Sequence, residues 1–487
     1  MTGADLILAA LAIPLLGCIV IVLCHRHPNL RETATLVTST LLFICVASLL
    51  PDVLAGARPQ AQLLEPLPGL PIAFEVEPLG MLFALIASGL WIVNSIYSIG
   101  YMRGNNETHQ TRFYVCFALA LASAIGIAFA ANLITLFLFY EFLTLVTYPL
   151  VTHHGTDEAK QGGRVYLALL LGTSVLFLLP AIVFTWHVTG TTEFRAGGIL
   201  AGHLAPASLA ALLALFTFGI GKAALMPFHR WLPAAMVAPT PVSALLHAVA
   251  VVKAGVFCIV KVLVYVFGLE TLVGSADWLV AIAGFTIVAA SVVALRADNL
   301  KRRLAYSTIS QLSYVIMAAA LLTPLAVMGA ALHLVTHAFG KITLFFAAGA
   351  IYTAAHKTEV SQLNGIGRRM PWTMSAFTVA ALSLIGIPPA AGFVSKWLIL
   401  SSAVDGGHAF ALTVLIASTL LNAAYFLPIV HAAFFRKSDE GDEAHAYGEA
   451  PWPMVLALVL TAGMTIALFF LSDSLLQLVK QLVAIRS

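Results

Sequence analysis

Long apolar runs alternate with short polar stretches along this chain. Each run is long enough to cross the roughly 30 Å hydrocarbon core of a bilayer as a helix. The runs lie near residues 4–24, 33–51, 77–101, 113–131, 133–153, 164–188, 207–232, 239–268, 276–296, 302–322, 324–354, 372–402, 408–436 and 452–472. The pattern predicts an all-α polytopic membrane protein with about 14 transmembrane helices.

Gly and Pro interrupt two of these runs, the seventh and the twelfth, close to a lysine. The interrupting residues are Gly219, Gly221 and Pro227 beside Lys222, and Pro388, Pro389 and Gly392 before Lys396. A bilayer offers no hydrogen-bond partner to the backbone groups that a break frees, so other protein or water must supply one. Breaks at corresponding places in two halves of a chain are typical of transporters built from inverted repeats. We therefore expect discontinuous helices 7 and 12 within two inverted five-helix repeats.

The expected repeats divide the chain into four parts. Residues 1–104 hold helices 1–3, residues 105–270 the first inverted repeat with helices 4–8, and residues 271–437 the second with helices 9–13. Residues 438–487 hold a cytoplasmic loop, helix 14 and a short C-terminal tail. The acidic tract at residues 439–443 of that loop is a candidate docking surface for a partner. The apolar N-terminus lacks a basic n-region, so we expect a retained first span.

Composition agrees with a membrane protein and restricts its chemistry. Hydrophobic residues make up 60% of the 487 residues and charged residues 10%, and the mean hydropathy is +0.96, which exceeds what a soluble core requires. The five cysteines lie in apolar runs without a C-x-x-C pair, which argues against disulfides and against zinc or iron–sulfur ligation. Phosphate-binding and dinucleotide-binding fingerprints are absent from the sequence. We expect no metal, no cofactor and no nucleic-acid partner.

Lysine and arginine outside the apolar runs are distributed unevenly. Sixteen lie in the odd-numbered loops, two in the even-numbered loops and two in the C-terminal tail. Cytoplasmic loops are enriched in these residues. We therefore expect a multi-pass protein of a prokaryotic inner (plasma) membrane with both termini on the non-cytoplasmic side.

The five remaining basic residues are all lysines inside the apolar runs, where Glu141 is the one deeply placed acid. The lysines are Lys222, Lys253, Lys261, Lys341 and Lys396. A charge within the bilayer costs about 3 kcal/mol on insertion scales, so each charged group is expected to face the bundle interior and a partner or water. Lys261 is the exception, because we expect it to lie near the outer surface and to extend its amine toward water.

The eleventh run carries His333, His337 and Lys341 at i, i+4 and i+8, which places them in one polar stripe on a helix. Leu334 stands where a zinc-binding H-E-x-x-H helix requires glutamate, so zinc is disfavoured. Histidines that pack as interhelical glue are the alternative. The lysine in register favours a proton relay, because imidazole exchanges protons near neutral pH.

Two more histidines lie near the interrupted seventh run. His247 precedes Lys253 by six residues on the eighth run, roughly mid-membrane, and joins the candidate relay. His229 follows the break near the expected cytoplasmic end of its run. There it is either a structural residue or a group for proton uptake.

Five motifs together carry a resemblance to a known family. They are LFYEFLTLVTYPL, GKAALMPFHRWLPAAMVAPTPVSALLHAVAVVKAGVF, NLKRRLAYSTISQLSY, HLVTHAFGKITLFFAAG and GIPPAAGFVSKW. The chain resembles the antiporter-like membrane subunits shared by proton-pumping NADH:quinone oxidoreductase (complex I), multisubunit Mrp-type cation/proton antiporters and membrane-bound hydrogenases. The resemblance covers roughly helices 3 to 14. It implies a proton-translocating or cation/proton-antiporting subunit that works beside other membrane subunits.

The resemblance also implies roles for individual residues. Glu141 matches the carboxylate that pairs with Lys222, Lys253 matches the central connecting lysine, His333, His337 and Lys341 match a relay, and Lys396 matches the terminal group. The lysine at position 396 and the short tail favour an antiporter-D-like or hydrogenase-type subunit. Any redox reaction of an oxidoreductase of this kind would reside in partner subunits.

Two other functions fit the sequence. A non-conducting scaffold subunit would keep the fold without the transport, and a self-contained secondary transporter of a small solute would also have broken helices at mid-membrane. Such a transporter would not need a row of lysines and histidines across the bundle. Sodium in place of protons, or alongside them, is a variant of the main hypothesis.

Overall fold

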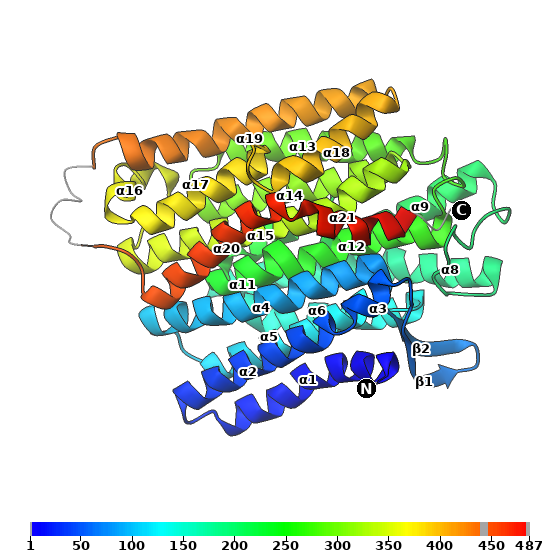
Figure 1. Ribbon diagram of the computed structural model, residues 1–487, viewed down its shortest axis with the longest axis horizontal. Coiled ribbons are helices and arrows are strands. Elements are labelled where there is room, and N and C mark those ends of the chain that lie inside the picture. Colours follow the sequence, from blue (N-terminus) through cyan, green and yellow to red (C-terminus); the bar gives the residue numbers. More distant parts are fainter. Residues whose placement is uncertain (1, 439–446, 484–487) are drawn as a thin grey trace.

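The computed structural model of the protein describes residues 2–438 and 447–483. Helices lie side by side along one direction and form a bundle, with a small β-hairpin at one end (Figure 1). Within the described ranges, 11 helices are long and apolar enough to cross a membrane, and Pro206–Gly219 and Pro371–Ile385 are shorter apolar helices. The predicted all-α polytopic architecture is confirmed, and the count of 14 spans stays a prediction. The acidic tract at residues 439–443 lies outside the described residues.

Short connections join most of the elements. The first half of the chain contains α1 Gly3–Leu23, α2 Pro28–Ala47, α3 Leu50–Leu54, β1 Gln60–Leu67, β2 Leu70–Glu75, α4 Pro78–Gly104, α5 Gln110–Ala128, α6 Leu133–Val151, α7 Asp157–Thr173, α8 Leu179–Thr189, α9 Pro206–Gly219, α10 Trp231–Ala234, α11 Thr240–Leu245 and α12 Val251–Val262. The second half contains α13 Asp277–Arg296, α14 Leu300–Ala320, α15 Pro324–Ala355, α16 Ile366–Arg369, α17 Pro371–Ile385, α18 Gly392–Asp405, α19 Ala409–Phe435, α20 Trp452–Phe470 and α21 Ser472–Val483. π-Helical turns at Ser174–Leu178, Leu246–Ala250 and Leu263–Phe267 join α7 to α8, join α11 to α12 and extend α12.

Polar side chains begin several of these helices. Asn132, Thr156 and Asn299 each accept a hydrogen bond from the backbone N–H three residues later. These are among the N–H groups that a helix leaves without an internal partner. Proline occupies the first turn of α9, α15 and α17, where its missing N–H costs nothing. The helix starts therefore follow from local sequence.

The structure contains a β-hairpin that the sequence analysis did not predict. β1 and β2 pair antiparallel, and Leu67 faces Leu70 across the turn. The turn contains Gly69, whose φ of 78° favours glycine. Alternation over two such short strands is a weak signal beside fourteen long apolar runs.

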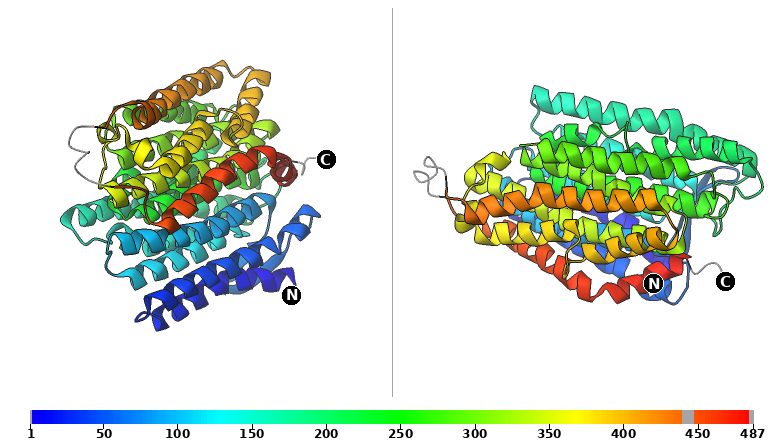
Figure 2. Two further views of the ribbon diagram at one scale, coloured as in Figure 1. Left: turned by 60° about the vertical axis from the view of Figure 1, so that its left-hand side comes forward. Right: turned by 90° about the horizontal axis from the view of Figure 1, so that it is seen from above.

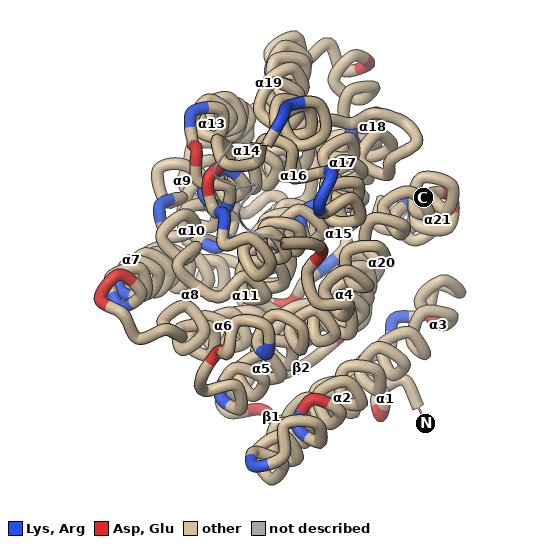
Figure 3. Tube along the Cα trace, turned by 90° about the vertical axis from the view of Figure 1, so that its left-hand side faces the viewer, with Lys and Arg blue, Asp and Glu red and all other residues tan. Residues whose placement is uncertain are grey.

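The two ends of the bundle differ in their covering and in their charge. We call one end the hairpin face, because it carries β1, β2 and residues 190–205 (Figures 1 and 2). The amphipathic helix α21 also packs there, with Leu478 and Leu482 buried against the bundle. We call the opposite end the basic face, because Lys and Arg gather around it (Figure 3). This asymmetry agrees with the charge count, and the orientation in the membrane stays a prediction.

The centre of the bundle is formed by α11, α12 and α15. All residues 251–262 of α12 are buried, and so are almost all residues of α15 between positions 326 and 351. A helix that is apolar on all sides belongs inside a bundle. The lysines and histidines on α12 and α15 are therefore enclosed by protein.

Helix α12 approaches the interrupted seventh run at Gly255. A Cβ atom built on Gly255 would lie 2.2 Å from the backbone nitrogen of Ala223 and 2.4 Å from the carbonyl carbon of Lys222. Both contacts involve backbone atoms, which cannot rotate away. Glycine at this position is what allows α12 to lie directly against the turn that carries Lys222.

We predict that Gly255→Ala lowers the thermal midpoint of the assembled complex, because overpacking of this kind costs about 1–3 kcal/mol. The matched control is Gly172→Ala in α7, where a Cβ has no heavy atom within 4 Å. That control should be neutral or slightly stabilising, because alanine favours a helix over glycine. Thermal unfolding of purified complexes measures both effects. Equal midpoints for the two variants would contradict the close approach.

Candidate functional site

The first helix break lies between α9 and α10, and its backbone finds partners in neighbouring side chains. α9 ends at Gly219, and a 3-10 turn, Gly221–Ala223, carries Lys222. The indole Nε1 of Trp231 donates to the carbonyl oxygen of Gly221 at 2.9 Å, and the backbone N–H of Lys222 donates to the hydroxyl of Tyr140 at 3.0 Å. The break predicted around Gly219, Gly221 and Pro227 is therefore present and is satisfied by protein.

The amine of Lys222 is fully buried against α6. Its Nζ donates to the carbonyl oxygen of Tyr140 at 2.8 Å and to Thr144 Oγ1 at 2.5 Å. It also lies 3.2 Å from the centroid of the Tyr140 ring, in a cation–π contact. Neutral oxygen atoms and a ring face thus hold this amine.

Glu141 is the next residue on α6, but it is not in direct contact with Lys222. Both carboxylate oxygens are buried and have no hydrogen-bond donor among the described residues. Lys222 is near enough to attract the carboxylate electrostatically. None of the ion pairs formed by the described residues joins the two side chains. The predicted pair is open in this conformation, and its closure stays a prediction.

The second break, between α17 and α18, holds Lys396. α17 ends at Ile385, and Lys396 Nζ donates to the carbonyl oxygens of Leu384 at 2.6 Å and Ile385 at 3.2 Å. These are the last carbonyls of α17, which attract a cation because no later N–H of the helix binds them. Pro388 and Pro389 lie in the break, whereas Gly392 is the first residue of α18 and donates its N–H to Ser383 Oγ at 3.1 Å.

A chain of polar side chains crosses the bundle between α12 and α18. Lys253 Nζ and His337 Nδ1 are in hydrogen-bond contact. The His337 ring stacks on that of His333 with centroids 5.7 Å apart, and the His333 ring stacks on Tyr314 at 5.7 Å. Lys396 Nζ lies 5.0 Å from the centroid of the Tyr314 ring. The structure therefore brings together Lys253, both relay histidines and Lys396.

Hydrogen bonds fix the orientation of His333. Its Nδ1 is 2.9 Å from Ser395 Oγ and its Nε2 is 3.0 Å from Gln311 Oε1. The remaining member of the predicted stripe, Lys341, is buried one turn after His337 and donates to the carbonyl oxygen of Leu304 at 3.1 Å. Lys341 thus flanks the chain instead of forming one of its links.

The other two predicted histidines lie on the side of Lys222 that faces the basic end. The buried His247 ring is 6.2 Å from Trp231 and 6.3 Å from Tyr166, and the Tyr166 hydroxyl is 3.4 Å from the Thr144 carbonyl oxygen. His229 lies 6.2 Å from the ring of Tyr306. Tyr306 lines a cavity of about 490 Å³ at the basic face, together with Arg230 and Lys301.

Sequence reasoning missed the neutral partners of the lysines and histidines. These are Tyr140, Thr144, Gln311, Tyr314 and Ser395. Tyr140, Thr144 and Ser395 lie in the same motifs as Glu141 or Lys396, next to the charged residue or three positions from it. Gln311 and Tyr314 lie in NLKRRLAYSTISQLSY, which holds no member of the predicted relay, so nothing in the sequence signalled them. Ser, Thr and Tyr are too common in membrane helices to be selected without the tertiary structure.

The prediction that Lys261 extends its amine toward water is wrong. Lys261 is 1% exposed, and its Nζ donates to the carbonyl oxygen of Ala130 at 2.8 Å and lies 3.3 Å from Glu77 Oε1. α12 is enclosed by protein along its whole length, so the amine of Lys261 meets protein groups before it can reach the surface. The same contact involves a buried acid that the sequence analysis did not single out, Glu77, which lies at the start of α4.

We predict that Trp231→Phe lowers the thermal midpoint of the complex, because it leaves the Gly221 carbonyl without its indole donor. A buried polar group without a partner costs about 1–3 kcal/mol. The control is Trp397→Phe, since Trp397 is 55% exposed. Differential scanning measurements on both purified variants check this, and a Trp231→Phe midpoint no lower than that of the control would contradict it.

Comparison with known proteins identifies relatives of this sequence. A family model described as NADH:quinone oxidoreductase/Mrp antiporter, transmembrane, matches residues 130–422. NADH-quinone oxidoreductase subunit N of Desulforudis audaxviator is 32% identical over 373 residues, which cover 75% of this chain and 73% of that protein. A probable K(+)/H(+) antiporter component of Rhizobium meliloti is 31% identical over 378 residues, covering 75% of this chain and 37% of that protein.

Solved structures share the fold. A chain of the Mrp complex from a Dietzia species superposes with a TM-score of 0.87 at 22% identity and covers 99% of this chain and 97% of its own length. A chain of the archaeal membrane-bound sulfane sulfur reductase superposes with a TM-score of 0.85 at 24% identity, covering 98% and 97%. The similarity extends over nearly the whole described bundle.

Proposed function

Because this chain belongs to the NADH:quinone oxidoreductase/Mrp antiporter family, we propose that it moves protons through a mid-membrane relay. The family resemblance predicted from the motifs is thereby confirmed. The chain is a multi-pass membrane subunit of the complex I-like or Mrp antiporter type. The relay consists of Glu141, Lys222, His247, Lys253, His333, His337, Lys341 and Lys396, and Lys341 acts in it from beside His337 without forming a link between Lys253 and Lys396.

The observation that carries this proposal is the chain of side chains from Lys253 to Lys396. Imidazole, phenol and amine groups follow one another from α12 across α15 and α14 to α18. The first link is a hydrogen-bond contact, the next two are stacked rings with centroids 5.7 Å apart, and the last is a cation–π contact at 5.0 Å. A row of this kind suits proton transfer and does not form a pocket for a small solute.

The coupling in this proposal is electrostatic. Two like charges 4 Å apart repel by roughly 4 kcal/mol at an effective dielectric constant of 20. A proton that arrives on Lys253 therefore pushes a proton away from the next group toward Lys396. When Glu141 approaches Lys222 it holds the proton of that lysine, and when it withdraws the proton passes on. Side-chain and water movements suffice, without a rigid-body opening of the bundle.

Protons reach Lys222 from the basic face in this scheme. The ring of Tyr306, which lines the cavity at that face, is 6.2 Å from His229. The buried His247 lies beside Tyr166, whose hydroxyl contacts the Thr144 carbonyl oxygen. Thr144 accepts a hydrogen bond from Lys222 itself. His229 is thus the group for uptake, and the basic face is the cytoplasmic side.

We predict that Glu141→Gln lowers the rate of coupled ion transport by about tenfold or more. Removing one partner of a buried ion pair typically costs about 3–5 kcal/mol, and a rise of about 1.4 kcal/mol in the activation barrier already slows a step tenfold. Glu141→Asp should retain part of the activity. Transport is measured as gradient-driven pH change in proteoliposomes that hold the assembled complex. The control is Asp405→Asn at the exposed end of α18. Parental transport by Glu141→Gln would remove the pair from the mechanism.

We further predict that Lys253→Gln abolishes coupled transport and leaves assembly intact, because it removes the first link to His337. The matched control is Lys160→Gln, an exposed lysine of α7 whose side chain is 56% exposed. Subunit composition after purification shows assembly, and the proteoliposome assay shows transport. Transport by Lys253→Gln at the parental rate would contradict the relay. Two structures of the complex that open to opposite sides of the membrane would favour alternating access instead.

A further inference from the structure

A buried acid–base cluster lies at the hairpin face, outside the relay. Glu77 caps the start of α4, Lys261 lies at the end of α12, and Tyr265 lies in the π-helical turn that follows. Lys261 Nζ is 3.3 Å from Glu77 Oε1, and the Tyr265 hydroxyl donates to Glu77 Oε2 at 3.0 Å. All three residues are buried.

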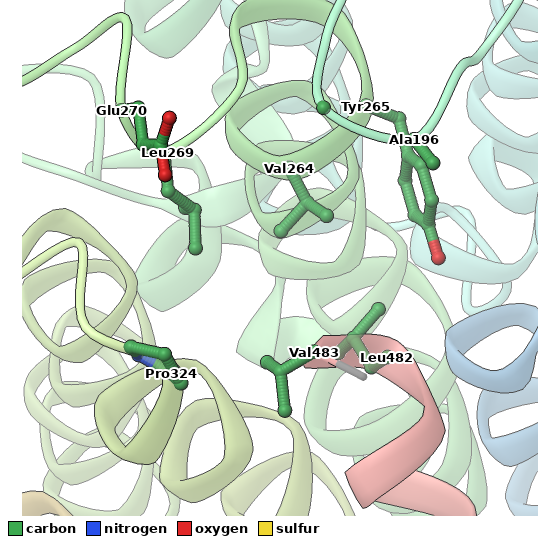
Figure 4. A pocket seen from close by; sticks show the side chains of 9 residues that line it. Ala196, Val264, Tyr265, Leu269, Glu270, Pro324, Leu482 and Val483 are labelled. Atoms are coloured by element: carbon green, nitrogen blue, oxygen red, sulfur yellow. The ribbon is translucent and has the colours of Figure 1, made fainter. Parts of the chain in front are cut away.

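Two cavities reach this cluster from the hairpin face, and Tyr265 lines both. The first has a volume of about 270 Å³ and is also lined by Glu77 and Lys261; Arg58 and Glu75 are the other charged residues on its wall. The second has a volume of about 170 Å³ and lies between the end of α12 and α21, with Tyr265 on one side and Leu482 near it (Figure 4). Buried titratable groups are therefore adjacent to space at the surface.

The cluster also lies close to the relay. Lys253 and Lys261 are on the same helix, eight residues or about 12 Å apart along its axis. Cys258 lies between them on α12 and is fully buried. Lys253 of the relay and Lys261 of the cluster thus lie within one short stretch of α12.

A purely structural role does not account for the cluster. Glu77 receives the backbone N–H groups of Leu79 at 2.8 Å and Gly80 at 3.0 Å, which is a cap that a neutral Ser, Thr or Asn also provides. A buried ion pair is often no more stabilising than apolar residues of the same volume. The charges on Glu77 and Lys261 therefore point to a use other than stability.

The donors around Glu77 favour a proton over a metal cation. Its two carboxylate oxygens already accept three hydrogen bonds, from two backbone N–H groups and the Tyr265 hydroxyl, and form an ion pair with the Lys261 amine. A sodium ion would have to displace the lysine, because like charges repel in a site of low dielectric. A proton needs no such displacement, since it can move between the amine and the carboxylate.

We propose that Glu77, Lys261 and Tyr265 form a proton-exchange site between Lys253 of the relay and the aqueous phase at the hairpin face. The inference rests on the relay proposed above. In the exchange step the Lys261 ammonium gives its proton to the Glu77 carboxylate, which leaves a neutral amine and a carboxylic acid. The acid then releases the proton to the cavity, and the amine accepts the next proton from the relay. Tyr265 stabilises the carboxylate by donating its hydroxyl.

The double variant Glu77→Gln/Lys261→Gln separates exchange from structure. It removes both charges, so no unpaired charge stays buried, and a structural pair would then be dispensable. We expect the double variant to assemble but to lose coupled transport in proteoliposomes by about tenfold or more. The control is Glu193→Gln, an exposed acid of the hairpin face that pairs with Arg195. Transport by the double variant at the rate of this control overturns the proposal.

A milder variant, Tyr265→Phe, tests the site even where the double variant fails to assemble. It keeps the ring and removes the hydrogen bond to the carboxylate. A hydrogen bond to the charged form of an acid favours that form. We therefore expect the pH of half-maximal transport, varied on the hairpin side alone, to rise by about one unit. The same profile varied on the basic side should stay unchanged. An unchanged profile on the hairpin side overturns the proposal.

Comparison with Lys253→Gln shows which proposal fails. If Lys253→Gln loses transport while both hairpin-face variants behave as the parent does, the relay stands and the exchange site is wrong. If Lys253→Gln transports at the parental rate, the relay itself is wrong, and the exchange site is overturned with it.

Discussion

The backbone of a membrane protein must satisfy its hydrogen bonds without lipid, and this constraint shapes both interrupted helices. At the first break, Trp231 and Tyr140 supply partners to the turn that carries Lys222. At the second, the last carbonyls of α17 remain free of helical partners and bind Lys396. At the second break the freed carbonyl oxygens therefore hold the amine of a lysine. At the first break the amine of Lys222 is held by oxygen atoms of the uninterrupted helix α6 instead.

The lysines of the membrane-spanning segments differ in the kind of partner that they contact. Lys222, Lys341 and Lys396 donate to carbonyl or hydroxyl oxygens, and Lys253 contacts an imidazole, whereas Lys261 lies beside a carboxylate. A neutral acceptor tolerates either protonation state of an amine, because losing the charge leaves no buried ion behind. A carboxylate partner instead couples the two protonation states. This difference distinguishes the relay from the cluster at the hairpin face.

Local sequence determined much of the architecture. Length and hydropathy of the apolar runs predicted the membrane bundle, since a helix that crosses a bilayer must satisfy its backbone and bury apolar side chains within one segment. Gly and Pro next to Lys222 and Lys396 predicted both breaks, because these residues act on the backbone that contains them. The spacing of His333 and His337 predicted their shared face. The β-hairpin was missed, since two short strands give little signal beside long helical runs.

Tertiary structure alone decided which groups meet. The Glu77–Lys261 pair joins the start of α4 to the end of α12, and His333 meets Gln311 of α14, although nothing in the spacing of these residues connects them. Whether Lys261 reaches water depended on what encloses α12, which is a property of the whole bundle. The sequence by itself therefore determined the type of fold, the position of both helix breaks and which charged residues lie inside the membrane-spanning segments. The packing of distant helices determined the partner of each charge, because that partner lies on a different segment.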